Sequence, residues 1–219
     1  STGVAHWQYD ERETAEITKA LMKFDGLSVR EAESVSVFKE HTGLEVKNIL
    51  DPTLLASPEI YTSLCSKAKL SGKGKLVTYM LDWTTEKQSI VDEACRNQGL
   101  EAQHILNPEK KKNGFLKRIF SQSPTVYDWV NQIATADFVV TDSFHGMAFS
   151  IIFGRQFVVI GNPARGMARF TSLLNHFGIT DRLTQHQLPN IDTPIDYNRV
   201  HSVLSELRQE GIEFLKKSL

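Results

Sequence analysis

The 219-residue sequence lacks a long apolar run. Its longest apolar stretches, "AFSIIF" and "FVVIG", are far shorter than the roughly 20 apolar residues that a membrane-spanning helix needs. The opening stretch "STGVAHWQYD" also lacks the basic start and apolar centre of a signal peptide. The sequence therefore predicts no transmembrane segment.

Cysteine and net charge are also scarce. Cys65 and Cys95 lie far apart, with no Cys-x-x-Cys or Cys/His metal spacing around them, so we expect two reduced, partly buried thiols. This suits the cytoplasm. The 25 basic and 26 acidic residues leave a formal net charge of -1, which gives no electrostatic reason to expect a nucleic acid or an anionic membrane as the principal partner.

Several common functional motifs are missing. There is no Gly-x-Gly-x-x-Gly after a strand, no Walker-type loop, no Asp-x-Asp pair and no His-Glu-x-x-His, so the sequence gives no ground for a dinucleotide, ATP or a bound metal. Ser143 does not lie in a Gly-x-Ser-x-Gly elbow, which argues against a serine hydrolase.

What is present from residue 74 onward is an alternation of apolar strands and helices. We predict strands over 74–81, 100–106, 137–141 and 156–161, and helices over 85–99, 123–136, 143–154 and 166–178. Ser123 is the expected N-cap of the second helix, with Pro124 at its first position. Such alternation is typical of a Rossmann-like α/β fold, a parallel sheet flanked by helices on both faces.

The two ends of the chain differ from this middle part. Residues 1–55 contain two expected helices (12–24, 31–43) and two strands (26–30, 44–50), followed by a loop over 51–58. This is too little apolar surface for an independent core, so we interpret residues 1–55 as the tail of a preceding N-terminal α/β domain. Residues 56–195 form the predicted Rossmann-like domain, and 196–219 a long or kinked amphipathic helix with Gly211 inside it.

The stretch "VVTDSFHG" marks a candidate site. In an open parallel sheet, ligands bind beyond the carboxyl ends of the strands, and this stretch runs from a strand into a helix. Asp142 or Ser143 can cap that helix, whose first N–H groups favour an anion. His145 falls in the first turn, where an imidazole can protonate a developing anion or a leaving phosphate, and Gly146 permits close approach of a ligand. The simpler alternatives are a structural histidine, ordinary caps and a packing glycine.

Three arginines add to the candidate site. Arg165 and Arg169, in "GNPARGMARF", follow the next strand, and two arginines there suit a phosphate or carboxylate, although they are equally typical of a solvated surface. Arg30 ends an apolar strand and has an ion pair with Glu31 or Glu33 as its simpler explanation. The basic segment 109–120 is typical of a solvated loop, and its alternative is contact with an anionic acceptor or the membrane surface.

Together, "FDGLSVRE" (24–31), "ILDPTLLA" (49–56) and the "TDSFHG" block resemble the polysaccharide pyruvyl transferase family. The resemblance implies a glycosyltransferase-B-like protein with an active site between two Rossmann-like halves, the N-terminal domain being largely missing from this chain. It also implies transfer of the pyruvyl group of phosphoenolpyruvate to a sugar of a cell-surface polysaccharide or of its lipid-linked precursor, as a ketal. The resemblance implies no metal and no other cofactor. It is compatible with a cytoplasmic protein, and contact with the inner face of the membrane is the alternative localisation.

The resemblance also suggests roles for single residues. His145 matches the family's active-site histidine, and Arg30 matches an arginine that holds phosphoenolpyruvate. Many members have an arginine two positions before the histidine, where this chain has Ser143; one hypothesis is that Arg165 or Arg169 replaces it. Two alternatives stay open: a nucleotide-sugar-dependent glycosyltransferase of the same fold type, and an inactive sugar- or anion-binding module.

Overall fold

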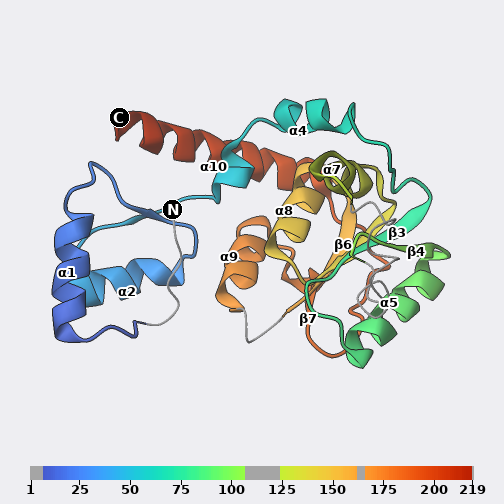
Figure 1. Ribbon diagram of the computed structural model, residues 1–219, viewed down its shortest axis with the longest axis horizontal. Helices are drawn as coiled ribbons and strands as arrows, with labels where there is room; N and C mark the ends of the chain where they lie inside the picture. The colour runs from blue at the N-terminus through green and yellow to red at the C-terminus, as the bar shows by residue number, and fades with distance from the viewer. Residues whose placement is uncertain (1–6, 107–123, 162–165, 219) are drawn as a thin grey trace, which may run out of the picture. The chain divides into compact units, whose positions relative to one another are not determined.

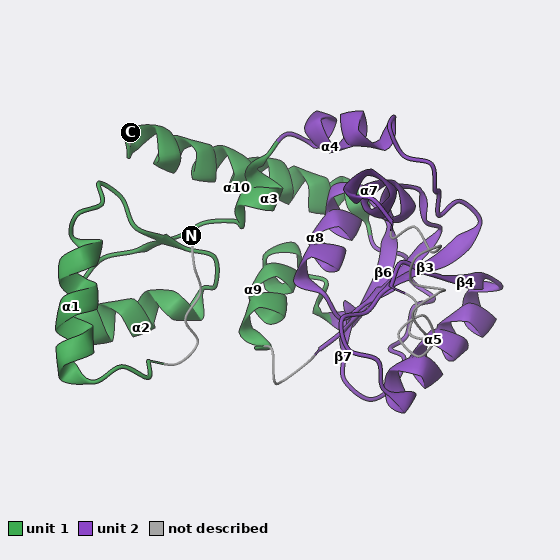
Figure 2. Cartoon of the chain, in the orientation of Figure 1, with its two compact units in different colours: residues 1–56, 163–180, 196–219 green, residues 57–162, 181–195 purple. Residues whose placement is uncertain are grey.

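The computed structural model describes residues 7–106, 124–161 and 166–218, and Figure 1 labels its helices and strands. The chain forms two compact units that are interleaved in sequence (Figure 2). Unit 1 comprises residues 1–56, 163–180 and 196–219, and unit 2 comprises residues 57–162 and 181–195. Our predicted segments are consecutive instead, and the interpretation of residues 1–55 as the end of a preceding domain stays a prediction.

Unit 2 is built on a five-stranded parallel sheet with the strand order β4-β3-β5-β6-β7. The strands are β3 (Lys75–Tyr79), β4 (Glu101–His104), β5 (Phe138–Thr141), β6 (Gln156–Ile160) and β7 (Leu183–Thr184), and the helices are α4 (Pro58–Cys65), α5 (Thr85–Gln98), α7 (Val126–Thr135) and α8 (Phe144–Ile152). This confirms the predicted α/β fold with a parallel sheet flanked by helices. The sequence pattern did not predict β7, because its two residues do not belong to an apolar run.

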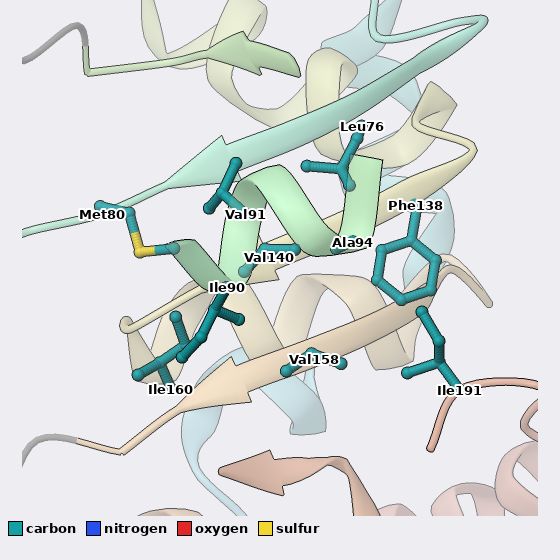
Figure 3. Close-up of a cluster of buried hydrophobic side chains, with 10 residues drawn as sticks. All are labelled: Leu76, Met80, Ile90, Val91, Ala94, Phe138, Val140, Val158, Ile160 and Ile191. Atoms are coloured by element: carbon teal, nitrogen blue, oxygen red, sulfur yellow. The ribbon is translucent and has the colours of Figure 1, made fainter. Parts of the chain in front are cut away.

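One face of the sheet is covered by α5. Alternate residues of three strands point to this face and pack against the helix in the cluster of Figure 3, which consists of Leu76, Met80, Ile90, Val91, Ala94, Phe138, Val140, Val158, Ile160 and Ile191. All of these side chains are buried. The apolar stripe that predicted an amphipathic helix is therefore the stripe that seals this face.

The opposite face is covered by α7 and α8. Val77, Val139 and Phe157, which alternate with the residues of the first cluster, are fully buried there. Helix α8 contacts both β5 and β6, and it also packs against α7. Burial from both sides explains why the central strands β5 and β6 are continuously apolar rather than alternating.

Polar side chains fix the ends of the helices in unit 2. Helix α5 begins at its N-cap Thr84 and ends at Gly99, whose φ of 63° is the left-handed conformation that favours glycine. Helix α7 begins after Thr125, which forms a capping box with Asp128, so the predicted start at Ser123 is wrong. Asp128 is held ionised by hydrogen bonds, first from the Thr125 hydroxyl and then from the Lys69 and Leu70 amides, which keep its pKa well below the usual range.

Unit 1 contains five helices and a pair of parallel strands among the described residues: α1 (Glu11–Leu21), β1 (Ser28–Val29), α2 (Glu33–Thr42), β2 (Lys47–Asn48), α3 (Pro52–Leu55), α9 (Ala168–Phe177) and α10 (Tyr197–Lys217). A small cluster of Val29, Phe38 and Val46 is buried in it. The predicted loop over 51–58 is wrong in part, because Asp51 caps α3 and Pro52 occupies its first position. Helix α10 runs through Gly211 as one element.

Within the described ranges, no helix is both long and apolar enough to cross a membrane. Cys65 and Cys95 are free thiols and half-buried, as we predicted, and burial raises the pKa of each.

Candidate functional site

The candidate site lies where two neighbouring strands of unit 2 end. Register pairs Tyr79 with Thr141, the last residues of β3 and β5. From β3 the chain continues through α5 to β4, whereas from β5 it continues through α8 to β6 on the other side. Connections that diverge in this way form a topological switch point, which is the place where ligands bind in open parallel sheets.

His145 lies in the first turn of α8 at this switch point. Every other residue from 141 to 150 is buried, and His145 alone is exposed. Its ring meets the neighbouring Phe144 ring edge to face, with the centroids 5.6 Å apart. The first N–H groups of a helix point toward its N-terminal end, so the imidazole stands beside a helix end that favours an anion.

The cap of α8 is Ser143, not Asp142. The Ser143 hydroxyl accepts a hydrogen bond from the Gly146 N–H at 3.4 Å, and its own N–H donates to Thr141 Oγ1 at 3.1 Å. The role of Asp142 as helix cap is therefore a wrong prediction. Ser143 is buried, so its hydroxyl is committed to the helix.

Gly146 is explained by packing. A Cβ atom built on this residue would lie 2.3 Å from Thr141 Oγ1 and 3.0 Å from Thr141 Cβ. The glycine therefore lets the first turn of α8 lie directly against the end of β5, which is the simpler of the two explanations that the sequence left open. Gly146 is buried, and its N–H group donates the capping hydrogen bond to the Ser143 hydroxyl.

Asp142 takes part in a buried network that the sequence did not reveal. Its carboxylate is fully buried and accepts hydrogen bonds from the N–H groups of Leu81 (2.7 Å) and Asp82 (3.1 Å). Lys87 of α5 forms an ion pair with it at 2.6 Å and also donates to the Asp82 carbonyl at 2.8 Å. The charge of Asp142, together with burial as the larger cause, raises the pKa of Tyr79 at the end of β3.

Arg30 lies in unit 1, just after β1. Its guanidinium pairs with Asp51 at 2.9 Å and with Glu31 at 3.6 Å. Burial opposes the ionisation of Asp51, but hydrogen bonds from the Thr53 backbone and from Arg30 outweigh it and lower the pKa of Asp51. The ion pair with Glu31, the simpler explanation given above, is therefore present, and a second carboxylate joins it.

The remaining arginines divide between the described and undescribed parts of the chain. Arg169 lies in α9 of unit 1, with its guanidinium carbon 5.2 Å from the centroid of the Phe170 ring. Arg165 and the basic segment 109–120 lie outside the described residues. In the part of the chain that the structure describes, no group of three or more His, Cys, Asp or Glu side chains is placed to hold a metal ion.

This geometry defines an α/β protein with a histidine at a helix N-terminus and a parallel-sheet switch point. The polysaccharide pyruvyl transferase family model matches residues 1–163, which is most of the chain, and the chain belongs to that family. The matched range includes Arg30 and the whole stretch from Asp142 to Gly146. None of the curated proteins compared with the chain matches it significantly.

Two solved structures of the wall teichoic acid polymerase TagF are similar to the chain. One is a variant soaked with CDPG, with 12% sequence identity, a TM-score of 0.43 and coverage of 99% of this chain and 62% of that chain. The other has 12% identity, a TM-score of 0.40 and coverage of 94% and 59%. The chain thus spans less than two thirds of the length of either structure.

Proposed function

We propose that the protein transfers the pyruvyl group of phosphoenolpyruvate to a sugar of a cell-surface polysaccharide or of its lipid-linked precursor, forming a cyclic pyruvate ketal. Family membership supports a transferase that modifies a polysaccharide. The observation that carries the proposal is the position of His145, the one exposed side chain in the run 141–150, beside the N-terminus of α8. A dianionic phosphate suits such a helix end.

The reaction needs a proton and a place for a leaving phosphate. Protonation of the methylene carbon of phosphoenolpyruvate makes C2 electrophilic, and a sugar hydroxyl adds there. Loss of inorganic phosphate and attack by a second hydroxyl close the ketal; one hydroxyl proton balances the proton on the new methyl group, and the other leaves with the phosphate. In this scheme His145 is the general acid or the charged partner of the phosphate. No step calls for a metal ion or a further cofactor.

The anionic donor needs more than one histidine. We assign the phosphate to the N-terminal end of α8 beside His145, with Ser143 and Gly146 building the helix end rather than binding directly. Arg30 is proposed as a donor ligand through the family resemblance, and its guanidinium is already paired with two carboxylates. Arg165 and Arg169 are proposed to supply the positive charge that Ser143 does not.

The proposal is tested first by binding. Thermal unfolding of the purified protein is measured with phosphoenolpyruvate, inorganic phosphate, and UDP, GDP and CMP sugars, because a ligand that binds the folded state stabilises it. We expect stabilisation by phosphoenolpyruvate, about 2.7 kcal/mol at a concentration one hundred times its Kd. The variant His145→Ala should lose most of this effect. His201→Ala is the matched control, because His201 is also an exposed histidine near the start of a helix, α10.

Turnover is then measured with phosphoenolpyruvate and lipid-linked oligosaccharides as acceptors, by phosphate release and by mass spectrometry of the ketal. We expect His145→Ala to abolish ketal formation and His201→Ala to retain it. Stabilisation by a nucleotide sugar alone would indicate a glycosyltransferase, and binding of phosphoenolpyruvate without turnover would indicate a binding module. Full activity of His145→Ala would refute the assignment.

A further inference from the structure

We propose that the buried ion pair between Asp142 and Lys87 is a positioning device that fixes the start of α8, and with it His145, against the loop after β3. This inference rests on the proposed function for its functional consequence. Asp142 lies directly before the cap Ser143 and three residues before His145. A shift of its carboxylate would therefore be transmitted to the first turn of α8.

The contacts of Asp142 join three separate elements. The side chain comes from the end of β5, the two amides that it accepts come from Leu81 and Asp82 after β3, and Lys87 comes from α5. Lys87 closes the network by donating to the Asp82 carbonyl at 2.8 Å. Two hydrogen bonds thus join the two loops at the switch point directly, and Lys87 bridges them through two more contacts.

Burial gives the pair its significance. The side chain of Asp142 is 0% exposed and that of Lys87 is 9% exposed. Taking two charges out of water is costly, and apolar residues of similar volume frequently stabilise a fold as well or better, so stability alone does not explain such a pair. What apolar contacts do not provide is the directional hold on two specific N–H groups. This argues that the pair sets the geometry of the loops.

Another lysine of the same unit offers a matched control. Lys75, at the amino end of β3, forms an ion pair with Glu101 of the same length, 2.6 Å, but Lys75 is only half-buried and Glu101 is exposed. Lys75 lies at the amino ends of the strands, whereas His145 lies beyond their carboxyl ends. Lys87→Met and Lys75→Met therefore each break one lysine–carboxylate pair next to β3, and only the first alters the switch point. Lys87→Gln, which keeps a hydrogen-bond donor, serves if the Met variant does not fold.

The first measurement needs no ligand. We compare amide hydrogen exchange of wild type, Lys87→Met and Lys75→Met at Leu81, Asp82 and the first turn of α8. We expect exchange there to accelerate by about tenfold or more in Lys87→Met only. The Leu81 and Asp82 amides donate to the carboxylate that Lys87 anchors, and the Ser143 and Gly146 amides belong to the helix start that this carboxylate holds in place. Unchanged exchange at the start of α8 in both Lys87 variants would overturn the proposal, whether or not the protein binds phosphoenolpyruvate.

The second measurement separates positioning from general stability. The Kd for phosphoenolpyruvate is measured with and without Lys87→Met, once in the wild-type protein and once in His145→Ala. Binding to the His145→Ala proteins is weak and is therefore followed at high ligand concentration. We expect about tenfold weaker binding in the wild-type background and less than about twofold in His145→Ala, since residues that act through one site are not additive. A purely structural role would instead give the same factor in both. If the wild type does not bind phosphoenolpyruvate at all, the proposed function fails while the exchange experiment still decides the positioning role.

Discussion

Replacement of Gly146 by alanine tests the close approach of α8 to β5. The new Cβ would lie 2.3 Å from Thr141 Oγ1, far inside van der Waals contact, so one side must move by about 1 Å. Thr141 resists, because its hydroxyl donates to the Tyr79 carbonyl at 2.6 Å and accepts from the Ser143 N–H at 3.1 Å. The substitution therefore forces either a backbone shift or the loss of both hydrogen bonds.

Either route has a similar energetic cost. An overpacked core loses about 1–3 kcal/mol, and two broken hydrogen bonds lose about 1 kcal/mol each. Against this, alanine is favoured over glycine within a helix by at most about 1 kcal/mol. We expect Gly146→Ala to lower the free energy of unfolding by about 1 kcal/mol or more. With a urea m-value of about 2 kcal/mol/M, the midpoint falls by about 0.5 M.

Urea unfolding followed by circular dichroism measures this effect, and Gly211→Ala is its control. A Cβ at Gly211 would lie 2.5 Å from Leu55 Cδ2, the end of a flexible side chain that can rotate away. The same substitution in α10 should therefore be neutral or stabilising. Thr141→Ala should reduce the cost of Gly146→Ala in the double variant, since the two atoms in conflict are coupled. A Gly146→Ala protein as stable as Gly211→Ala would refute the reasoning.

Two further predictions concern acid. Folding lowers the pKa of Asp128, so the stability that its carboxylate contributes is present above about pH 4, the ordinary pKa of an aspartate, and is lost as the pH falls through the lower pKa of the folded state. Urea midpoints measured from pH 7 to 2 should therefore depend less on acid in Asp128→Asn than in the wild type. An unchanged dependence would contradict this. Burial lowers the pKa of His176, outweighing the opposite effect of Glu210, so stability should decline as the pH falls below about 6.5, and His176→Gln should remove that part of the decline. A decline of the same size in His176→Gln would show that other groups cause it.

The architecture of unit 2 could be predicted because its elements carry strong periodic signals. The central strands β3, β5 and β6 are buried on both faces and form apolar runs in the sequence. Helix α5 ends at Gly99, whose left-handed backbone conformation favours glycine. Two short elements were not predicted: α3 has only four residues, and the two residues of β7 follow no apolar run. The predicted start of α7 is wrong because Thr125, with Asp128 three residues later, forms a capping box. Local capping chemistry decided the boundary.

The candidate site could be located from the sequence but not resolved into roles. His145 was found because it interrupts an apolar strand–helix junction. Asp142 and Ser143 are both good caps by residue type, and only the backbone shows that Ser143 accepts the amide while Asp142 turns toward β3. Lys87 was missed because a lysine in an amphipathic helix is normally solvated, and the partner that buries it lies far away in sequence.

The polar residues at the end of β5 point inward, and this changes how the whole stretch is understood. The Thr141 hydroxyl is bound to β3, the Asp142 carboxylate to the following loop and α5, and the Ser143 hydroxyl to α8. Three polar side chains in a row are thus used to hold a helix start in place, and the first side chain free to face solvent is His145. Serine at position 143 accordingly provides a neutral cap where an arginine would bring a charge. The electrostatic hold on an anion must then come from the helix end itself and from cations elsewhere in the chain, which is why the proposed donor site depends so strongly on how rigidly the first turn of α8 is fixed.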